Sequence, residues 1–204
     1  MGGSPTATIR PYRDADRDAL YDVCLRTGAD GEDASGRHRD PRLLGSVYVG
    51  PYLAFEPGLA FVLDDGSGAQ GYVLGARDTL AFESSCARHW WPALRARYAG
   101  AIFPAGGADA DVVALLRDPP ATNHDVVRDF PSHLHIDLLP GCQGAGLGRR
   151  LIDTLLSALS ATGSPGVHLG VSAANHCAIG FYRRVGFVEL GAAGGGVTMG
   201  RRLL

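Results

Sequence analysis

The chain has 204 residues, of which 46% are hydrophobic and 20% charged, and its formal net charge is -2. This composition is typical of a globular protein, and the length suits one domain over residues 1–204, with a flexible start over residues 1–7. The net charge gives no reason to expect binding to nucleic acid. No apolar run reaches the roughly 18 residues of a membrane span, so we expect no membrane association either. The four cysteines form no Cys-x-x-Cys pair and the first residues lack a leader pattern, so we expect a cytoplasmic protein.

All 19 basic residues are arginine, because the sequence contains no lysine. A lysine Schiff base, a P-loop lysine and a kinase strand lysine are therefore excluded.

The first elements are a predicted strand and a predicted helix. Residues 8–12 predict an edge strand, because Pro11 supplies no ladder donor. The helix that follows can be capped by Asp14 or Asp16, and Gly28 stands where a left-handed residue would end it.

The middle of the chain begins with a predicted surface loop over residues 29–41. Two apolar runs, at residues 59–63 and 71–75, are separated by turn-forming residues and predict a β-hairpin. The segment 77–130 is less regular, and we expect it to form an insertion. Helices are expected there over residues 84–98, with a break near Pro92, and over residues 109–117.

The last third of the chain alternates strands and helices more clearly. The expected elements are a strand over residues 132–140, a helix over 147–159 ended by Gly163, a strand over 166–171, a short helix from Asn175 to Gly186, and a hairpin of residues 187–190 and 197–203. A glycine-rich turn, Gln143 to Gly148 (QGAGLG), joins the first strand to the first helix.

This turn suits a phosphate group. Small residues let the backbone approach an anion, and the amide groups at the start of the following helix point toward it. A P-loop is excluded by the lack of lysine, while a dinucleotide fingerprint would need its third glycine one place later. A tight strand-to-helix turn with no ligand is the remaining alternative.

The motif Gln-x-x-Gly-x-Gly at Gln143, after a strand ending in Pro140, resembles the acetyl-CoA loop of the GNAT acetyltransferase family. A second motif, Asn175-His-Cys-Ala-Ile-Gly-Phe-Tyr182 followed by Arg-Arg-Val-Gly-Phe, resembles the family pattern at the expected distance. The resemblance implies an α/β GNAT fold, with a mixed twisted sheet of about six to seven strands flanked by helices. Its central parallel strands are expected to splay apart.

The resemblance also implies a cofactor, acetyl-CoA, and the residues that hold it. The loop amides would bind the pyrophosphate beside Arg149, Leu138 would bind the pantetheine arm and polarise the thioester carbonyl, and Asn175 would bond to the arm. Tyr182 would donate a proton to the departing thiolate, and a packed core tyrosine is the alternative. The full set of predicted cofactor contacts is Leu138, Leu139, Gln143, Gly144, Ala145, Gly146, Leu147, Gly148, Arg149, Asn175 and Tyr182.

The resemblance does not supply the general base, because Gly170 stands where many relatives of the family carry glutamate. Alternation on the preceding strand places His133, His135 and Asp137 on one face. We predict Asp137 as the base, with His135 or a water as relay. A structural hydrogen-bond acceptor and a metal site of these three residues are the alternatives, and we predict no metal.

The predicted acceptor is an amine on a small molecule, peptide or protein, and it would react directly within a ternary complex. The acceptor pocket is expected from the first helix, its following loop and the insertion at residues 77–130. Trp90 and Trp91 are expected mainly in the core. Asp78, Glu83 and His89 are candidate groove residues.

The sequence is also similar to the acetyltransferase-like domain at the C-terminus of O-GlcNAcases, over most of residues 8–204. That domain is regarded as a pseudo-acetyltransferase. The alternative function is therefore a weakly active or inactive module that binds CoA, or a protein or peptide partner.

Overall fold

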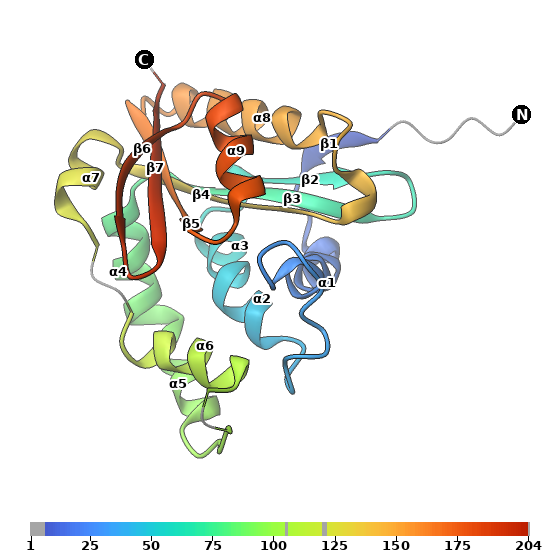
Figure 1. The fold of residues 1–204 in the computed structure, drawn as a ribbon, viewed down its shortest axis with the longest axis vertical. Coiled ribbons are helices and arrows are strands. Elements are labelled where there is room, and N and C mark those ends of the chain that lie inside the picture. Colours follow the sequence, from blue (N-terminus) through green and yellow to red (C-terminus); the bar gives the residue numbers. More distant parts are fainter. Residues whose placement is uncertain (1–6, 105, 120–121, 204) are drawn as a thin grey trace, which may run out of the picture.

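The structure, a computed structural model, describes residues 7–104, 106–119 and 122–203. A single seven-stranded sheet forms its centre, with helices on both faces (Figure 1). This arrangement is the predicted α/β fold. The predicted flexible start, residues 1–7, lies outside the described residues except at Ala7.

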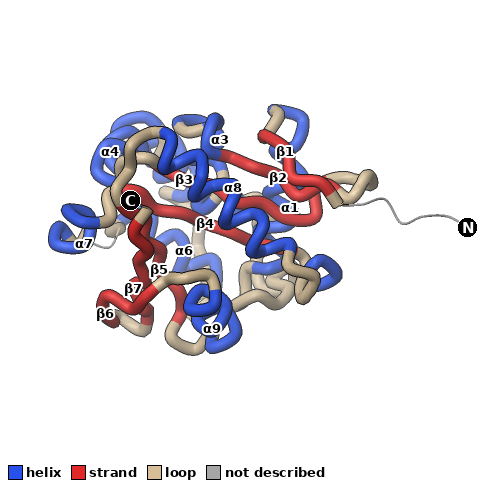
Figure 2. Tube along the Cα trace, turned by 90° about the horizontal axis from the view of Figure 1, so that it is seen from above, coloured by secondary structure: helices blue, strands red, loops and turns tan. Residues whose placement is uncertain are grey.

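The strands follow the order β1-β2-β3-β4-β5-β7-β6 across the sheet. They are β1 (Thr8–Pro11), β2 (Ala60–Asp64), β3 (Ala69–Ala76), β4 (Ser132–Leu138), β5 (Gly166–Ser172), β6 (Val188–Ala193) and β7 (Gly196–Arg202). Neighbouring strands pair antiparallel except β4 and β5, which are parallel. Strands β2 to β4 run side by side across the molecule, while β5, β7 and β6 turn away from them (Figure 2).

Nine α-helices connect or cover the strands within the described residues. They are α1 (Arg17–Thr27), α2 (Leu43–Tyr48), α3 (Gly50–Phe55), α4 (Thr79–His89), α5 (Trp91–Tyr98), α6 (Ala108–Arg117), α7 (His124–Asp129), α8 (Leu147–Ala161) and α9 (His176–Arg184). None of these described helices is long and apolar enough to cross a membrane.

Each face of the sheet has its own hydrophobic core. On one face, the predicted apolar stripe of α8 packs on β3 and β4, with Leu151 and Leu155 fully buried against Val73 and Leu134. On the other face, α1 to α3 cover Tyr72 and neighbouring residues of β3 (Figure 1). Successive side chains of a strand point to opposite faces, so β4 contributes to both sides of the sheet.

The helix after β1 ends differently from the prediction. Gly28 has a φ of -73°, which is not left-handed, and the positive φ values fall at Asp30 and Gly31. A Cβ at Gly28 would lie 2.4 Å from Cδ1 of Leu44, so the glycine is needed for close packing of α1 on α2. Asp16 accepts a hydrogen bond from the amide of Arg13, at the turn before α1, rather than capping α1 itself.

Three short helices were not expected from the sequence. Helices α2, α3 and α7 have only six residues each, too few to display a helical hydrophobic period. Packing places the first two, since Gly45 lies under the ring of Tyr21 and Gly50 under Trp90, where a Cβ would approach within 2.4 Å.

The surface loop after α1 is held to α6 by a buried polar cluster. Asp109 accepts a hydrogen bond from Nδ1 of His38 at 2.7 Å and another from the amide of Arg39 at 2.9 Å. The side chains of His38 and Asp109 are only 4% and 6% exposed. The cluster fixes the position of the loop relative to the helix that follows.

Replacing Asp109 with alanine should lower the free energy of unfolding by about 2–4 kcal/mol, because a buried histidine and amide lose their acceptor. The matched control is Asp111→Ala on the exposed side of the same helix, which should cost less than about 1 kcal/mol. Urea unfolding of both variants measures the difference, and equal losses would contradict the structural role of Asp109.

Candidate active site

Strands β4 and β5 pair only at their beginnings. The pairing joins Ser132 to Val167 and His133 to His168, and no further register pair follows. On its other edge, β4 continues to pair with β3 as far as Leu138. A gap therefore opens between the two central strands. The predicted separation of the central parallel strands is confirmed.

Backbone amides line this gap. The amide of Leu139 donates to the carbonyl oxygen of Gln70, toward β3. Because donors alternate along a strand, the amides of Leu138 and Ile136 face the gap instead. The structure thus brings Leu138 to the gap and directs the amide of Leu139, also predicted as a cofactor contact, away from it.

The glycine-rich turn follows β4 and starts α8. Gly144 and Gly146 have φ values of +80° and +77°, and a Cβ on either would meet no atom within 4 Å. Gly146 is the N-cap of α8, so the first amides of that helix lack helical partners and point outward. The side chain of Gln143 donates to the carbonyl oxygen of Leu138 at 3.0 Å, which holds the turn against the end of β4.

Helix α9 follows β5, and two predicted residues lie on it or at its start. Asn175 is the N-cap of α9, accepting from the amide of Ala178, and its Nδ2 donates to the carbonyl oxygen of Asp30 at 3.0 Å. Tyr182 is buried, and its Oη has no hydrogen-bond partner among the described residues. Burial, followed by the charge of Asp137, raises the pKa of Tyr182 above its ordinary value, so its hydroxyl is protonated at neutral pH.

Arg149 lies near the loop on the exposed side of α8. One of its guanidinium nitrogens donates to the carbonyl oxygen of Arg184 at 2.8 Å. This bond joins the start of α8 to the end of α9.

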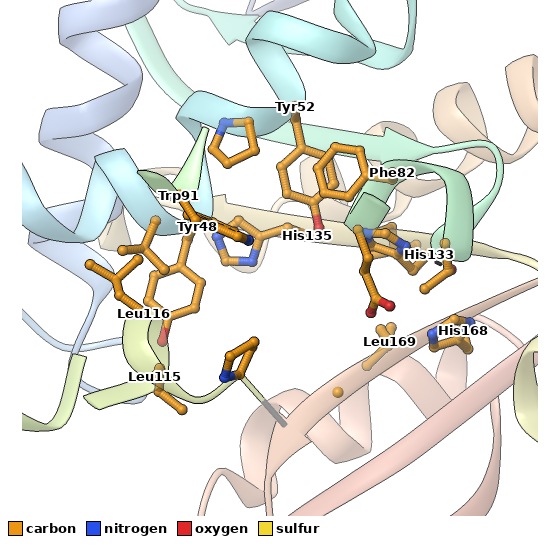
Figure 3. A pocket seen from close by; sticks show the side chains of 17 residues that line it. Tyr48, Tyr52, Phe82, Trp91, Leu115, Leu116, His133, His135, His168 and Leu169 are labelled. Atoms are coloured by element: carbon orange, nitrogen blue, oxygen red, sulfur yellow. Dashed lines mark hydrogen bonds between the residues drawn. The ribbon is translucent and has the colours of Figure 1, made fainter. Parts of the chain in front are cut away.

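A cavity of about 450 Å³ lies where β4 and β5 begin to separate. Its walls combine helices α2 to α6 with the two strands, so the insertion at 77–130 supplies part of it. Figure 3 shows Tyr48, Trp91, Leu115 and Leu116 on one side and His133 and His168 on the other. The remaining lining residues include Tyr52, Phe82, Glu83, His135 and Gly170.

The two tryptophans divide between core and cavity. Trp91 lines the cavity, whereas Trp90 packs beside α3 and donates from its indole to the carbonyl oxygen of Ser46 at 2.8 Å. Of the three candidate groove residues, Glu83 lines the cavity, whereas Asp78 and His89 are not among its lining residues. Asp78 caps the start of α4 by accepting from the amide of Ala81, and His89 is exposed at the end of that helix.

His135 and Asp137 form a polar cluster with two residues that sequence reasoning missed. Tyr72 donates to Oδ2 of Asp137 at 2.5 Å, and Nε2 of His135 lies 3.1 Å from Oη of Tyr72 and 3.2 Å from Oδ2 of Asp137. The sulfur of Cys24 lies within 4.8 Å of the ligand atoms of His135 and Asp137. Tyr72 is directly opposite Asp137 in the β3–β4 register, a pairing that the hairpin alone could not reveal.

The hydrogen positions in this cluster follow from its geometry. The hydroxyl hydrogen of Tyr72 goes to Asp137, so the short contact between Tyr72 and His135 requires a hydrogen on Nε2 of His135. Burial disfavours a charged imidazole, but the carboxylate of Asp137 outweighs it and raises the pKa of His135 to about 10. His135 is therefore an imidazolium paired with Asp137 at neutral pH.

His133 does not join that cluster. Its Nδ1 lies 2.8 Å from Oγ1 of Thr79, which itself donates to the carbonyl oxygen of Pro131. Burial, followed by the charges of His168 and His135, lowers the pKa of His133 to about 3. The three β4 residues considered as a metal site thus lie in two separate environments.

Comparisons with known proteins place this geometry in context. A profile described as the Acetyltransferase (GNAT) family matches residues 110–187. The crystal structure of SsHAT has a TM-score of 0.91 at 42% identity, covering 98% of this chain and 100% of that one. The structure of yncA from Salmonella typhimurium, solved with its cofactor acetyl-CoA, shares the fold with a TM-score of 0.55 at 17% identity over 98% and 95% of the two chains.

The chain is also similar to part of a longer curated protein. Protein O-GlcNAcase of Rattus norvegicus is 27% identical over 92% of this chain. The chain spans about a fifth of the length of that relative, because the match covers 20% of it.

The ion pair on β4 predicts a measurable titration. His135 should titrate near pH 10 in the intact protein and below about 6.5 in Asp137→Asn, where burial acts without the carboxylate. Its contribution to stability is complete below about pH 6.5 and is lost as the pH rises through about 10. NMR of the ring carbons measures both values, and Asp153→Asn on the exposed side of α8 is the control. An unchanged titration in Asp137→Asn would contradict the pairing.

Proposed function

The chain belongs to the GNAT acetyltransferase family, and on that premise we propose that it transfers acetyl from acetyl-CoA directly to an amine in a ternary complex. The observation that carries the proposal is the gap between β4 and β5. Its edge leads to the glycine-rich turn at one end and to the cavity at the other. Two substrates can therefore meet across the gap.

The residues of the loop fit a pyrophosphate. Gly144 and Gly146 leave open space where side chains would stand, and the first amides of α8 are available donors. We propose that the amides of residues 144–148 hold the pyrophosphate. The amide of Gln143, also predicted as a contact, instead donates to the carbonyl oxygen of Pro140 at 3.1 Å. Acetyl-CoA would supply an acetyl group activated as a thioester.

The gap offers donors for the rest of the cofactor. We propose that the amide of Leu138 binds the pantetheine arm and that the amide of Ile136, which lies deeper and nearer the cavity, polarises the thioester carbonyl. Asn175 already uses one donor and one lone pair, so its amide keeps one N–H and one lone pair for the arm.

Tyr182 fits the role of the general acid. Its phenol is buried in α9 and keeps its proton at neutral pH, and a thiolate needs only modest protonation help because the thiol pKa is near 8.5. We propose that Oη of Tyr182 donates this proton to the departing sulfur.

The cavity fits the acceptor. Its walls are mostly apolar and aromatic, which suits an amine with an apolar body, and Glu83 supplies a carboxylate for the ammonium group. A cavity of about 450 Å³ admits a small amine or one side chain of a peptide.

Titration calorimetry with acetyl-CoA tests the proposal first. The protein should bind acetyl-CoA with micromolar or tighter affinity and should not bind NAD. Gly146→Asp should weaken acetyl-CoA binding by at least about 1–3 kcal/mol, because a carboxylate would stand at the pyrophosphate site.

Two matched variants separate charge from backbone strain. Gly146→Asn has nearly the same shape without the charge, and Gly163→Asn strains a left-handed glycine at the far end of α8. Equal affinity in Gly146→Asp and wild type would overturn the loop assignment. CoA binding without transfer to any amine would instead support an inactive module.

Tyr182→Phe should reduce turnover by roughly 10- to 1,000-fold while leaving acetyl-CoA affinity nearly unchanged, because only the proton donor is removed. Tyr12→Phe is the control. It removes a phenol that follows β1 and donates to Asp14. Transfer measured as thiol release gives both rates, and unchanged turnover in Tyr182→Phe would exclude it as the acid.

A further inference from the structure

His168 lies on β5 at the point where the gap begins, opposite His133. Its Nδ1 is 2.7 Å from the carbonyl oxygen of Phe130. Because a carbonyl oxygen can only accept, Nδ1 carries the ring hydrogen, and in the neutral ring Nε2 carries the lone pair. The backbone thus fixes both the tautomer and the orientation of this imidazole.

His168 is one of the residues that line the cavity. Nε2 has no hydrogen-bond partner among the described residues. No fully buried side-chain nitrogen or oxygen among them lacks a partner, so Nε2 is not fully buried. Two residues along β5, Gly170 leaves the space between His168 and the widening gap free, since a Cβ there would meet nothing within 4 Å. Figure 3 shows His168 beside Leu169 at the cavity wall.

The other two histidines of the cavity are poorly suited to accept a proton. His135 already holds its proton on Nε2 through Tyr72 and Asp137. His133 has the same Nδ1-donor arrangement as His168, but with its pKa lowered to about 3 it is a very weak base. Asp137, the base predicted from sequence, accepts a hydrogen bond from Tyr72 and forms an ion pair with His135.

The surroundings of His168 lower its pKa, so the ring is neutral at pH 7. Burial lowers its pKa, while the backbone of Phe130 and of Ser132 and the carboxylate of Glu83 on α4 act in the opposite direction. On β7, its pairing partner Gly200 has no side chain, and on α7 Asp129 is paired with Arg202. His133 is a further titratable neighbour, and its ring centroid lies 5.8 Å from that of His168.

We propose that His168 is the general base of the transfer reaction, accepting a proton from the acceptor ammonium at Nε2 directly or through one water. This assignment rests on the proposed function. The imidazole of His168 would take the place of the glutamate carboxylate that many relatives carry at the position of Gly170. His168 is two residues earlier on β5, and its side chain lies on the same face of the strand.

The proton and electron balance is as follows. Nε2 of His168 takes one proton from the ammonium, and the freed lone pair forms the C–N bond to the acetyl carbon. The C–S bond breaks, and sulfur leaves with its electron pair and takes the proton of Tyr182. A second proton leaves the nitrogen and returns to Tyr182 through water, and the imidazolium of His168 releases its proton to solvent.

A spectroscopic test needs no turnover. In protein labelled with ¹⁵N-histidine, His168 should show a hydrogen on Nδ1 and an unprotonated Nε2 at pH 7, and it should titrate below its ordinary pKa of about 6.5. The same state should persist with CoA bound. A hydrogen on Nε2 at pH 7 would overturn the assignment.

The kinetic test compares His168→Asn with His133→Asn. Each asparagine can keep the hydrogen bond made by Nδ1 while removing Nε2. With 2-phenylethylamine as acceptor, His168→Asn should lower kcat/KM by about 10²- to 10⁴-fold at pH 7 without changing acetyl-CoA affinity.

The pH profiles distinguish a base from a structural residue. Wild type and His133→Asn should be nearly flat from pH 7 to 9, whereas His168→Asn should rise about tenfold per pH unit, because it depends on free amine. Imidazole should partly restore the rate of His168→Ala. A wild-type profile retained by His168→Asn would overturn this proposal alone, whereas a wild type that acetylates no amine would overturn the proposed function as well.

Discussion

The central constraint on this molecule is that β4 stops pairing with β5 after His133. A parallel pair that continued would consume the amides of Ile136 and Leu138 in a ladder and would close the space between the strands. Because the strands separate, the sheet holds a polar backbone edge at its centre. The loop before α8 and the cavity both adjoin that edge, so the two halves of the site depend on one interruption of the sheet.

The three cavity histidines demonstrate how a partner decides the charge of a buried imidazole. Burial disfavours the charged form of each of them. His135 has a carboxylate partner and becomes an ion pair, whereas His133 and His168 have neutral oxygen partners and stay uncharged. Histidines on adjoining strands therefore differ in charge because their hydrogen-bond or ion-pair partners differ. The partner is Asp137 for His135, Thr79 for His133 and the carbonyl oxygen of Phe130 for His168.

Much of the frame was predictable because its signals are local. The α8 stripe, the hairpin of β2 and β3, and the glycine turn each lie within a short stretch of sequence. The six-residue helices lack such a signal, and Gly28 was misread because its constraint is the approach of Leu44, not its own φ. Alternation grouped the β4 side chains on one face, but their partners come from distant segments. Tyr72 is 65 residues from Asp137, and the role of His168 depends on a carbonyl 38 residues away.

The interrupted pairing also affects local dynamics. Central strands are usually the best protected part of a sheet against amide hydrogen exchange, because ladder bonds must break before exchange. Ile136 and Leu138 lie on a central strand, but their amides face a gap with no ladder partner. Their exchange should resemble that of an edge strand, while the amide of Leu139, bonded to Gln70, remains protected. The middle of the sheet thus contains amides whose protection reports directly on whatever fills the space between β4 and β5.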